Sequence, residues 1–111
     1  RMLDVRTIFA ERENGVMSLR RGFEMKKGER VLVVEDVVTT GGSVNEIIQL
    51  AKKADATLAG VGYIVDRSNG KTKFNAKAFS VLQMDVVTYP PDTCPLCKEG
   101  TPAVKPGSRG L

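Results

Sequence analysis

The stretch that decides the fold is "VLVVEDVVTTGGSVNE", residues 31–46. It opens with four consecutive aliphatic residues, passes through two carboxylates, and reaches a run of threonine, glycine and serine. An uninterrupted aliphatic run that ends in polar residues is typical of a parallel strand. We therefore predict a central strand that is covered on both faces and leads into a polar loop.

A helix is predicted directly after this loop. Ser43, followed three positions later by Glu46, matches a capping box, in which each side chain satisfies a free amide at the helix start. Apolar side chains then recur at helical spacing, with polar side chains between them: Val44, Ile47, Ile48, Ala51 and Ala54. We expect this helix to pack one face against a sheet.

The flanking sequence extends the same architecture. Residues 58–65 predict a second buried strand, and residues 79–82 predict a last one. The order strand, helix, strand indicates a parallel pair joined by a right-handed crossover. Upstream, two short apolar runs flank Asn14 and Gly15, which accept positive φ, so residues 7–23 predict a β-hairpin.

The chain divides into a core and a tail. From Tyr89 onward it holds all five prolines and shows no hydrophobic periodicity. We expect an α/β core over residues 1–90 and an irregular arm over residues 91–111. With 111 residues, of which 41% are hydrophobic and 27% charged, the composition is that of one ordinary globular domain.

Composition also narrows the range of partners. No apolar stretch approaches the roughly 20 residues needed to cross a bilayer, so we predict no membrane association and a cytoplasmic setting. The net charge of +4 suits a phosphorylated small molecule as well as nucleic acid. The few aromatic residues are not interleaved with basic ones, which argues against nucleic acid.

The chain has no histidine, so imidazole acid–base catalysis and histidine metal ligation by this chain are excluded. Its two cysteines, Cys94 and Cys97, form one CxxC, whereas a structural zinc site normally needs four ligands. Pro91 and Pro95 place the pair in a turn rather than at the start of a helix, and we interpret it as a reduced pair. Half of a metal site, completed by another subunit, is the alternative.

The loop after the first long strand has the composition of a phosphate site. Gly41 and Gly42 allow a tight turn close to a ligand, and the amides at a helix start, with nearby hydroxyls, surround anions. The Gly-Lys-Ser/Thr ending of a nucleoside-triphosphate loop is absent, as is the dinucleotide fingerprint. Glu35 and Asp36 would repel a phosphate, unless they accept hydrogen bonds from sugar hydroxyls. The segment therefore predicts a ribose phosphate, with magnesium near both carboxylates if the ribose carries pyrophosphate.

These residues resemble a known family. "VLVVEDVVTTGGS" is similar to the phosphoribosyl-pyrophosphate motif of the type I phosphoribosyltransferases. The stretches "FAERENGVMSLRRGF", "GVGYIVDRS" and "TYPPDTCPLCKEGTPAVKPGSR" resemble the bacterial orotate phosphoribosyltransferases, so the likeness covers nearly the whole chain. It implies a Rossmann-like α/β core with a parallel sheet, which we expect to be partial because the family's amino-terminal portion is missing here.

The resemblance also implies a function and its residues. It implies transfer of ribose 5-phosphate from 5-phosphoribosyl 1-pyrophosphate to orotate, which gives orotidine 5'-phosphate and pyrophosphate in UMP biosynthesis. Glu35 and Asp36 would be catalytic and hold the ribose and magnesium region, while Thr39 and Arg67 would contact orotate. A donor-binding loop over residues 35–43 is implied, made of Glu35, Asp36, Val37, Val38, Thr39, Thr40, Gly41, Gly42 and Ser43.

The hairpin departs from the family's pattern. The family's flexible loop carries lysines and a histidine, and it folds over pyrophosphate in the partner subunit's site of a homodimer. The matching region offers Arg12, Arg20 and Arg21 instead, which we regard as candidate pyrophosphate contacts. A solvated hairpin face is the alternative interpretation of Arg20 and Arg21.

The residues alone leave other interpretations open. Glu35 and Asp36 would also suit a solvated strand end, and Arg67 a surface ion pair. A phosphoribosyltransferase for another base, such as a purine, and a regulator that binds the donor without turnover are the alternative functions. An arginine at the end of the neighbouring strand favours an acidic base, because its planar guanidinium suits a carboxylate.

Overall fold

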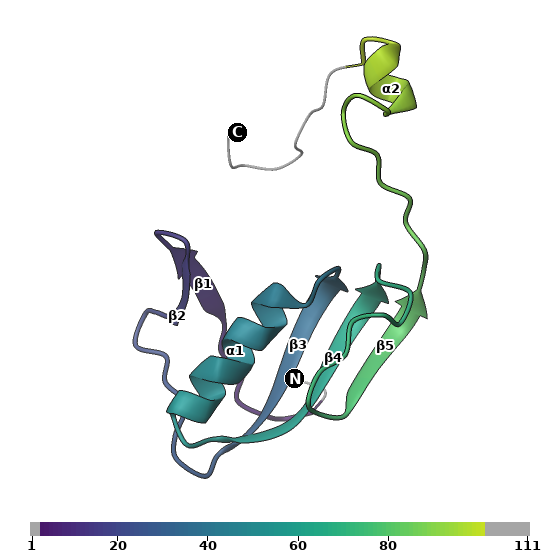
Figure 1. Ribbon diagram of the computed structural model, residues 1–111. Coiled ribbons are helices and arrows are strands. Elements are labelled where there is room, and N and C mark those ends of the chain that lie inside the picture. Colours follow the sequence, from purple (N-terminus) through teal and green to yellow (C-terminus); the bar gives the residue numbers. More distant parts are fainter. Residues whose placement is uncertain (1–2, 102–111) are drawn as a thin grey trace.

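A computed structural model describes residues 3–101 of the chain. It contains a sheet of three strands with a helix against one face, a separate hairpin, and an arm that leaves the sheet (Figure 1). In chain order the elements are β1 Ala10–Glu13, β2 Val16–Leu19, β3 Arg30–Val38, α1 Gly42–Lys53, β4 Thr57–Asp66, β5 Ala78–Gln83 and α2 Pro95–Lys98.

The sheet has the order β3-β4-β5, and both neighbouring pairs are parallel. The chain passes from β3 to β4 through α1, so the predicted strand, helix, strand unit is confirmed. The arrowheads of the three strands reach the same edge of the sheet (Figure 1). The segments that follow these strands are therefore neighbours, which is where open parallel sheets bind ligands.

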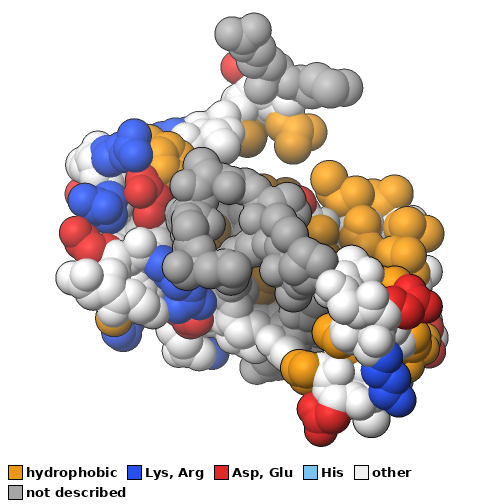
Figure 2. All heavy atoms as spheres, turned by 90° about the horizontal axis from the view of Figure 1, so that it is seen from above, with side chains coloured by type: hydrophobic (Ala, Val, Ile, Leu, Met, Phe, Trp, Pro, Cys, Tyr) orange, Lys and Arg blue, Asp and Glu red, His pale blue; other side chains and the backbone are white. Residues whose placement is uncertain are grey.

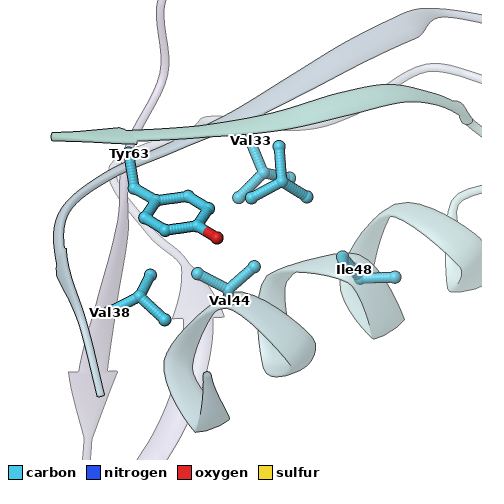
Figure 3. Close-up of a cluster of buried hydrophobic side chains, with 6 residues drawn as sticks. Val33, Val38, Val44, Ile48 and Tyr63 are labelled. Atoms are coloured by element: carbon cyan, nitrogen blue, oxygen red, sulfur yellow. The ribbon is translucent and has the colours of Figure 1, made fainter. Parts of the chain in front are cut away.

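The hydrophobic core lies between α1 and the sheet. Val44 and Ile48 project from successive turns of α1 toward Val33 and Tyr63 of the sheet (Figure 3). Val38 and Val61 complete the buried cluster. The predicted one-sided helix is confirmed, because its apolar face covers the sheet while its basic residues Lys52 and Lys53 fall in the last turn, where they favour the helix dipole.

The other face of the sheet is open, so the prediction of a strand covered on both faces is wrong for the described residues. Alternate side chains along each strand point away from α1, and the large apolar ones among them remain exposed. Examples are Val34 at 68%, Phe79 at 71% and Val81 at 73% exposed. Figure 2 shows a group of hydrophobic side chains together on the surface, at the upper right of that view.

The predicted capping box is also wrong. Helix α1 begins at Gly42, its N-cap is Gly41, and no side chain caps it. Gly41 has φ 78°, a left-handed conformation that glycine adopts without strain, and its carbonyl accepts the amide of Asn45 at 2.9 Å. Because the chain turns at Gly41, Ser43 already lies inside the helix. The carboxylate of Glu46 accepts a hydrogen bond from Arg12 at 2.5 Å instead.

The predicted hairpin is confirmed, although its first strand starts at Ala10 rather than near Thr7. Strands β1 and β2 pair antiparallel around Asn14 (φ 50°) and Gly15 (φ 82°). Two successive positive φ values are what a two-residue hairpin turn requires. The bond between Arg12 and Glu46 ties this hairpin to α1.

The arm is irregular from the end of β5 to the short helix α2, which stands away from the sheet (Figure 1). Cys94 is the N-cap of α2 and Cys97 lies within it, so the pair opens one helical turn and the prediction of a plain turn is wrong. Pro95 fits the first helical position because its missing amide would be unbonded there. Both thiols are free. Residues 102–111 of the predicted arm lie outside the described residues.

Candidate functional site

The two acidic residues belong to a strand rather than to a loop. Strand β3 continues through Glu35 and Asp36 to Val38, which pairs with Asp66 of β4. The loop between β3 and α1 is therefore shorter than the predicted 35–43, since its last residues Gly42 and Ser43 form the first turn of α1. The extra strand length follows from Val37 and Val38, which are β-branched residues suited to a sheet ladder.

A small hollow of about 60 Å³ lies where β3 passes into α1. Its walls are every residue of 35–43 except Asp36, together with Val44. The first amides of a helix have no partner within the helix, and they carry the positive end of its dipole. Helix α1 has 12 residues and no acidic side chain in its first turn, so nothing in that turn opposes an anion. The hollow therefore combines free amides with the hydroxyls of Thr39, Thr40 and Ser43 nearby.

A second and larger concavity of about 530 Å³ lies on the open face of the sheet. Both Glu35 and Asp36 line it, at one end of an apolar surface made by Val34, Gly62, Tyr63, Ile64, Phe79 and Val81. Glu35 thus borders both concavities, while Asp36 borders only the larger one. Asp36 therefore lies outside the small hollow, and Glu35 lies at the boundary between the hollow and the larger concavity.

The two carboxylates are held by their own backbone. Oε1 of Glu35 accepts a hydrogen bond from the amide of Asp36 at 3.0 Å, and Oδ1 of Asp36 accepts one from the amide of Val37 at 2.7 Å. Partial burial raises the pKa of Glu35, against the lowering effect of the Asp36 amide, and the neighbouring Asp36 carboxylate raises this pKa further. A bound cation, or hydroxyl groups that donate hydrogen bonds, would therefore stabilise the ionised form of Glu35.

Arg67 directly follows β4, at the same edge of the sheet as the hollow. Its amide donates to the carbonyl of Val38 at 2.8 Å, so its backbone lies against the start of the loop between β3 and α1. The side chain is exposed. No ion pair or hydrogen bond within residues 3–101 engages its guanidinium. The position predicted for Arg67 from the sequence is confirmed, and its contact with a ligand stays a prediction.

The three hairpin arginines are engaged with carboxylates of this chain. Arg12 pairs with Glu46, while Arg20 pairs with Glu13 at 3.4 Å and Arg21 with Glu11 at 2.9 Å. Arg21 also stacks over the ring of Phe9 at 5.5 Å. None of the three lines the two concavities described above. The structure therefore does not bring them to the hollow, and their predicted contact with pyrophosphate stays a prediction.

Comparison with known proteins decides the family. The phosphoribosyl transferase domain matches residues 4–93, a span that includes the hairpin, the hollow and Arg67. The chain belongs to this family. The α/β architecture described above belongs to this phosphoribosyl transferase domain.

Curated relatives of this phosphoribosyl transferase domain include several bacterial proteins. The chain is 59% identical over 111 residues to the orotate phosphoribosyltransferase of Pelotomaculum thermopropionicum, with 100% of this chain and 58% of the relative covered. It is 60% identical over 111 residues to the orotate phosphoribosyltransferase of Thermotoga maritima, with 100% of this chain and 59% of the relative covered. The resemblance predicted from the sequence is confirmed. The chain spans about 58% of the length of the first of these relatives.

Solved structures agree on the fold. The adenine phosphoribosyltransferase of Leishmania tarentolae superposes with a TM-score of 0.52 at 26% identity, covering 70% of this chain and 41% of that one. The adenine phosphoribosyltransferase of Saccharomyces cerevisiae gives a TM-score of 0.53 at 21% identity, covering 71% of this chain and 47% of that one. The predicted type I phosphoribosyltransferase fold with a parallel sheet is confirmed.

Sequence reasoning missed two residues at this site of the phosphoribosyl transferase domain. Thr72 donates its hydroxyl to the carbonyl of Thr39 at 2.8 Å, although the two lie 33 positions apart in the chain. Asp66, the last residue of β4, is fully buried. The segment that contains Thr72 reads only as a polar loop, because no periodicity or turn signal indicates a long-range partner.

Proposed function

We propose that the protein of which this chain is a part is an orotate phosphoribosyltransferase. It transfers ribose 5-phosphate from 5-phosphoribosyl 1-pyrophosphate to a ring nitrogen of orotate, giving orotidine 5'-phosphate and pyrophosphate in UMP biosynthesis. The observation that carries this proposal is the 59–60% identity, along the entire chain, with proteins that bear this name. A cytoplasmic location stays a prediction from the sequence.

The hollow between β3 and α1 would hold the 5'-phosphate of the donor. Amides at the start of α1 and the hydroxyls of Thr39, Thr40 and Ser43 would donate hydrogen bonds to the phosphate oxygens. Glu35 and Asp36, at the rim and in the adjoining concavity, would accept hydrogen bonds from the ribose hydroxyls. This division places the negative side chains on the sugar and leaves the phosphate to uncharged donors.

The carboxylates of Glu35 and Asp36 are suitable ligands for magnesium. Within residues 3–101 no cluster of three or more acidic, cysteine or histidine side chains could enclose a metal ion. Magnesium usually binds through one or two carboxylates together with substrate phosphate oxygens and waters, and Glu35 and Asp36 supply that number. When bound with the donor, the ion would neutralise charge on the departing pyrophosphate.

The base site would be completed by Thr39 and Arg67. The exposed guanidinium of Arg67 can form two parallel hydrogen bonds with the carboxylate of orotate, a contact that a neutral purine does not offer. The positive charge of Arg67 favours orotate over adenine, the base named for the similar solved structures.

Catalysis would depend on positioning and charge rather than on a covalent nucleophile. As the pyrophosphate leaves, positive charge develops at the anomeric carbon, and the carboxylates of Glu35 and Asp36 stabilise that charge from beside the ribose. Arg12, Arg20 and Arg21 would meet the pyrophosphate from the hairpin of a partner subunit in a homodimer. The ion pairs of Arg12 with Glu46 and of Arg20 with Glu13 are exposed, and such pairs contribute only about 0–1 kcal/mol, so a pyrophosphate can displace them. Glu11, the partner of Arg21, is partly buried.

Release of pyrophosphate by the full-length protein tests this function. We expect turnover with orotate and none with adenine. Arg67→Ala should raise KM for orotate about 10-fold or more, because a charge-assisted hydrogen bond contributes roughly 1.5–3 kcal/mol. Arg67→Lys, which keeps the charge but not the fork, should recover part of the loss. Turnover with adenine in place of orotate would support the purine alternative, and donor binding without any turnover would support the regulator.

A further inference from the structure

A hydrogen-bonded chain begins at the buried end of β4. The carboxylate of Asp66 is 0% exposed, and it is satisfied entirely by the segment that follows it. Its Oδ1 accepts from the amide of Ser68 at 2.8 Å and from the hydroxyl of Ser68 at 2.6 Å, while its Oδ2 accepts from the amide of Gly70 at 2.9 Å. These bonds, the Ser68 hydroxyl first, lower the pKa of Asp66. The connection between β4 and β5 is thereby folded into a fixed shape.

The same chain of bonds continues to the loop that borders the hollow. The hydroxyl of Ser68 accepts the amide of Thr72 at 2.9 Å. The hydroxyl of Thr72 then donates to the carbonyl of Thr39 at 2.8 Å. The path Asp66–Ser68–Thr72–Thr39 therefore runs without a break from the end of β4 to the first residue after β3. We call these four residues the brace.

Side-chain packing reinforces the brace at Gly41. A Cβ atom at Gly41 would lie 2.7 Å from Cγ2 of Thr72 and 2.8 Å from Cε1 of Phe74, closer than such atoms approach. Phe74 in turn meets the ring of Tyr63 edge-on, with 6.0 Å between the ring centroids. The turn that starts α1 is thus pressed directly against the connection between β4 and β5, and glycine is needed there for space as well as for its φ of 78°.

Arg67 sits inside this arrangement. It lies between Asp66 and Ser68 in the chain, and its amide is bonded to Val38, the last residue of β3. The conformation of the brace therefore determines where Arg67 stands relative to the phosphate hollow. Catalytic groups must be held within a fraction of an ångström of their productive positions, so a rigid link between the two sites has a direct effect on rate.

We propose that Thr72 and Asp66 are positioning residues, which couple the base-binding Arg67 to the phosphate-binding loop through the brace. This inference rests on the proposed function, because it assigns Arg67 to the base and residues 39–43 to the donor. Neither Thr72 nor Asp66 contacts substrate in this scheme. The effect of each passes through the hydrogen bonds described above.

The test uses the full-length protein with Thr72→Val, which keeps the shape of the side chain but removes the hydroxyl that donates a hydrogen bond to the carbonyl of Thr39. Thr72→Ser keeps the hydroxyl and is the rescue variant. Thr57→Val is the matched control, since Thr57 is exposed on β4 and its hydroxyl makes no hydrogen bond within residues 3–101. Calorimetry gives the donor affinity, steady-state kinetics give kcat and KM for orotate, and thermal melting confirms that each variant is folded.

We expect Thr72→Val to weaken donor binding and to raise KM for orotate about 3- to 10-fold each, the effect of one lost neutral hydrogen bond. Thr72→Ser and Thr57→Val should behave like the wild type. In an Arg67→Ala background, Thr72→Val should no longer change KM for orotate but should still weaken donor binding. If Thr72 had a purely structural role, Thr72→Val would instead raise KM for orotate by the same factor in both backgrounds.

The inference is overturned if Thr72→Val changes neither the affinity for 5-phosphoribosyl 1-pyrophosphate nor KM for orotate. It is also overturned if Thr72→Ser changes these two constants as much as Thr72→Val does. If Thr72→Val does not fold, Thr72→Ala, which removes the hydroxyl without adding bulk, takes its place under the same criteria. Failure of the proposed function is a separate result, since a wild-type protein that shows no turnover with orotate would reveal it before any variant is compared.

Discussion

Glu35 stands where its charge is unfavourable in the free protein and useful once a sugar is bound. Its carboxylate is partly removed from water beside the carboxylate of Asp36. Site residues often carry such a cost, because the interactions that offset it arrive with the ligand. At this scale the sequence predicted a ligand site from an acidic pair next to threonine and glycine, and the role of Glu35 and Asp36 in that site stays a prediction. It did not indicate that Glu35 borders both concavities whereas Asp36 borders only the larger one.

The raised pKa of Glu35 predicts the pH dependence of a stability difference. Below its ordinary pKa of 4.5, Glu35 is protonated in the folded and unfolded chain, so Glu35→Gln should melt like the wild type. As the pH rises through the higher pKa of the folded protein, ionised Glu35 destabilises the wild type only. Glu35→Gln should then be the more stable of the two at pH 7, by no more than about 0.5 kcal/mol for this partly exposed position.

Thermal melting of both proteins at pH 4 and pH 7, without ligand, measures this difference. Glu99→Gln serves as the control, because it makes the same chemical change at an exposed position at the end of α2. A wild type that is more stable than Glu35→Gln at pH 7 would contradict the assigned environment of Glu35.

Elements with a strong periodic pattern were predictable, and elements shaped by distant contacts were not. Helix α1 and strands β3, β4 and β5 follow from runs of aliphatic residues and from helical spacing. The helix start was misplaced because Ser43 and Glu46 match a capping box, whereas Gly41 is fixed by its contact with Thr72 and Phe74. That contact joins segments more than 30 positions apart, so no local pattern could have revealed it.

The short helix α2 in the arm is a second element that the local sequence pattern did not predict. Proline predicts a turn here, but Pro95 occupies the first position of α2 and Cys94 is the residue at its N-cap position. Hydrogen bonding from the backbone amide of Cys97 and from its thiol lowers the pKa of Cys94, while the interaction with Cys94 raises the pKa of Cys97. The two thiols of the CxxC should therefore differ in reactivity.

This difference is measurable with single-cysteine variants. In Cys97→Ser the remaining Cys94 still lies at the amino end of α2, beside the backbone amides that lower its pKa, so it should be alkylated by iodoacetamide at pH 7 several times faster than Cys97 in Cys94→Ser. Each variant serves as the control for the other, because the labelled chain differs only in which thiol is kept. Equal rates would contradict the opposite directions of the two pKa shifts.

At the scale of the whole molecule, the hollow between β3 and α1 lies beside an uncovered apolar face. Val34, Ile64, Phe79 and Val81 are exposed on this face, and the same residues form the wall of the concavity that Glu35 and Asp36 border. An apolar patch of this kind on a protein surface usually marks a site of contact. The chain spans about 58% of the length of a curated relative.

This arrangement predicts that the 111-residue chain binds the donor but does not turn it over. The phosphate hollow is built wholly from residues 35–44, whereas the base side of the larger concavity is open. Calorimetry with 5-phosphoribosyl 1-pyrophosphate and a pyrophosphate-release assay with orotate measure the two properties, with the full-length protein as the positive control for both. Orotate-dependent turnover by the 111-residue chain would show that its site is already complete.

The proposed site for 5-phosphoribosyl 1-pyrophosphate depends most on the carboxylate of Glu35, which would accept hydrogen bonds from the ribose beside the hollow. The direct test is calorimetric titration of 5-phosphoribosyl 1-pyrophosphate, with magnesium, into the full-length protein and its Glu35→Gln variant, with Glu99→Gln as the control. We predict that Glu35→Gln binds the donor about 10-fold more weakly or worse, because each lost bond to a charged acceptor contributes roughly 1.5–3 kcal/mol, while Glu99→Gln binds like the wild type. Equal donor affinity in the wild type and Glu35→Gln would contradict the account.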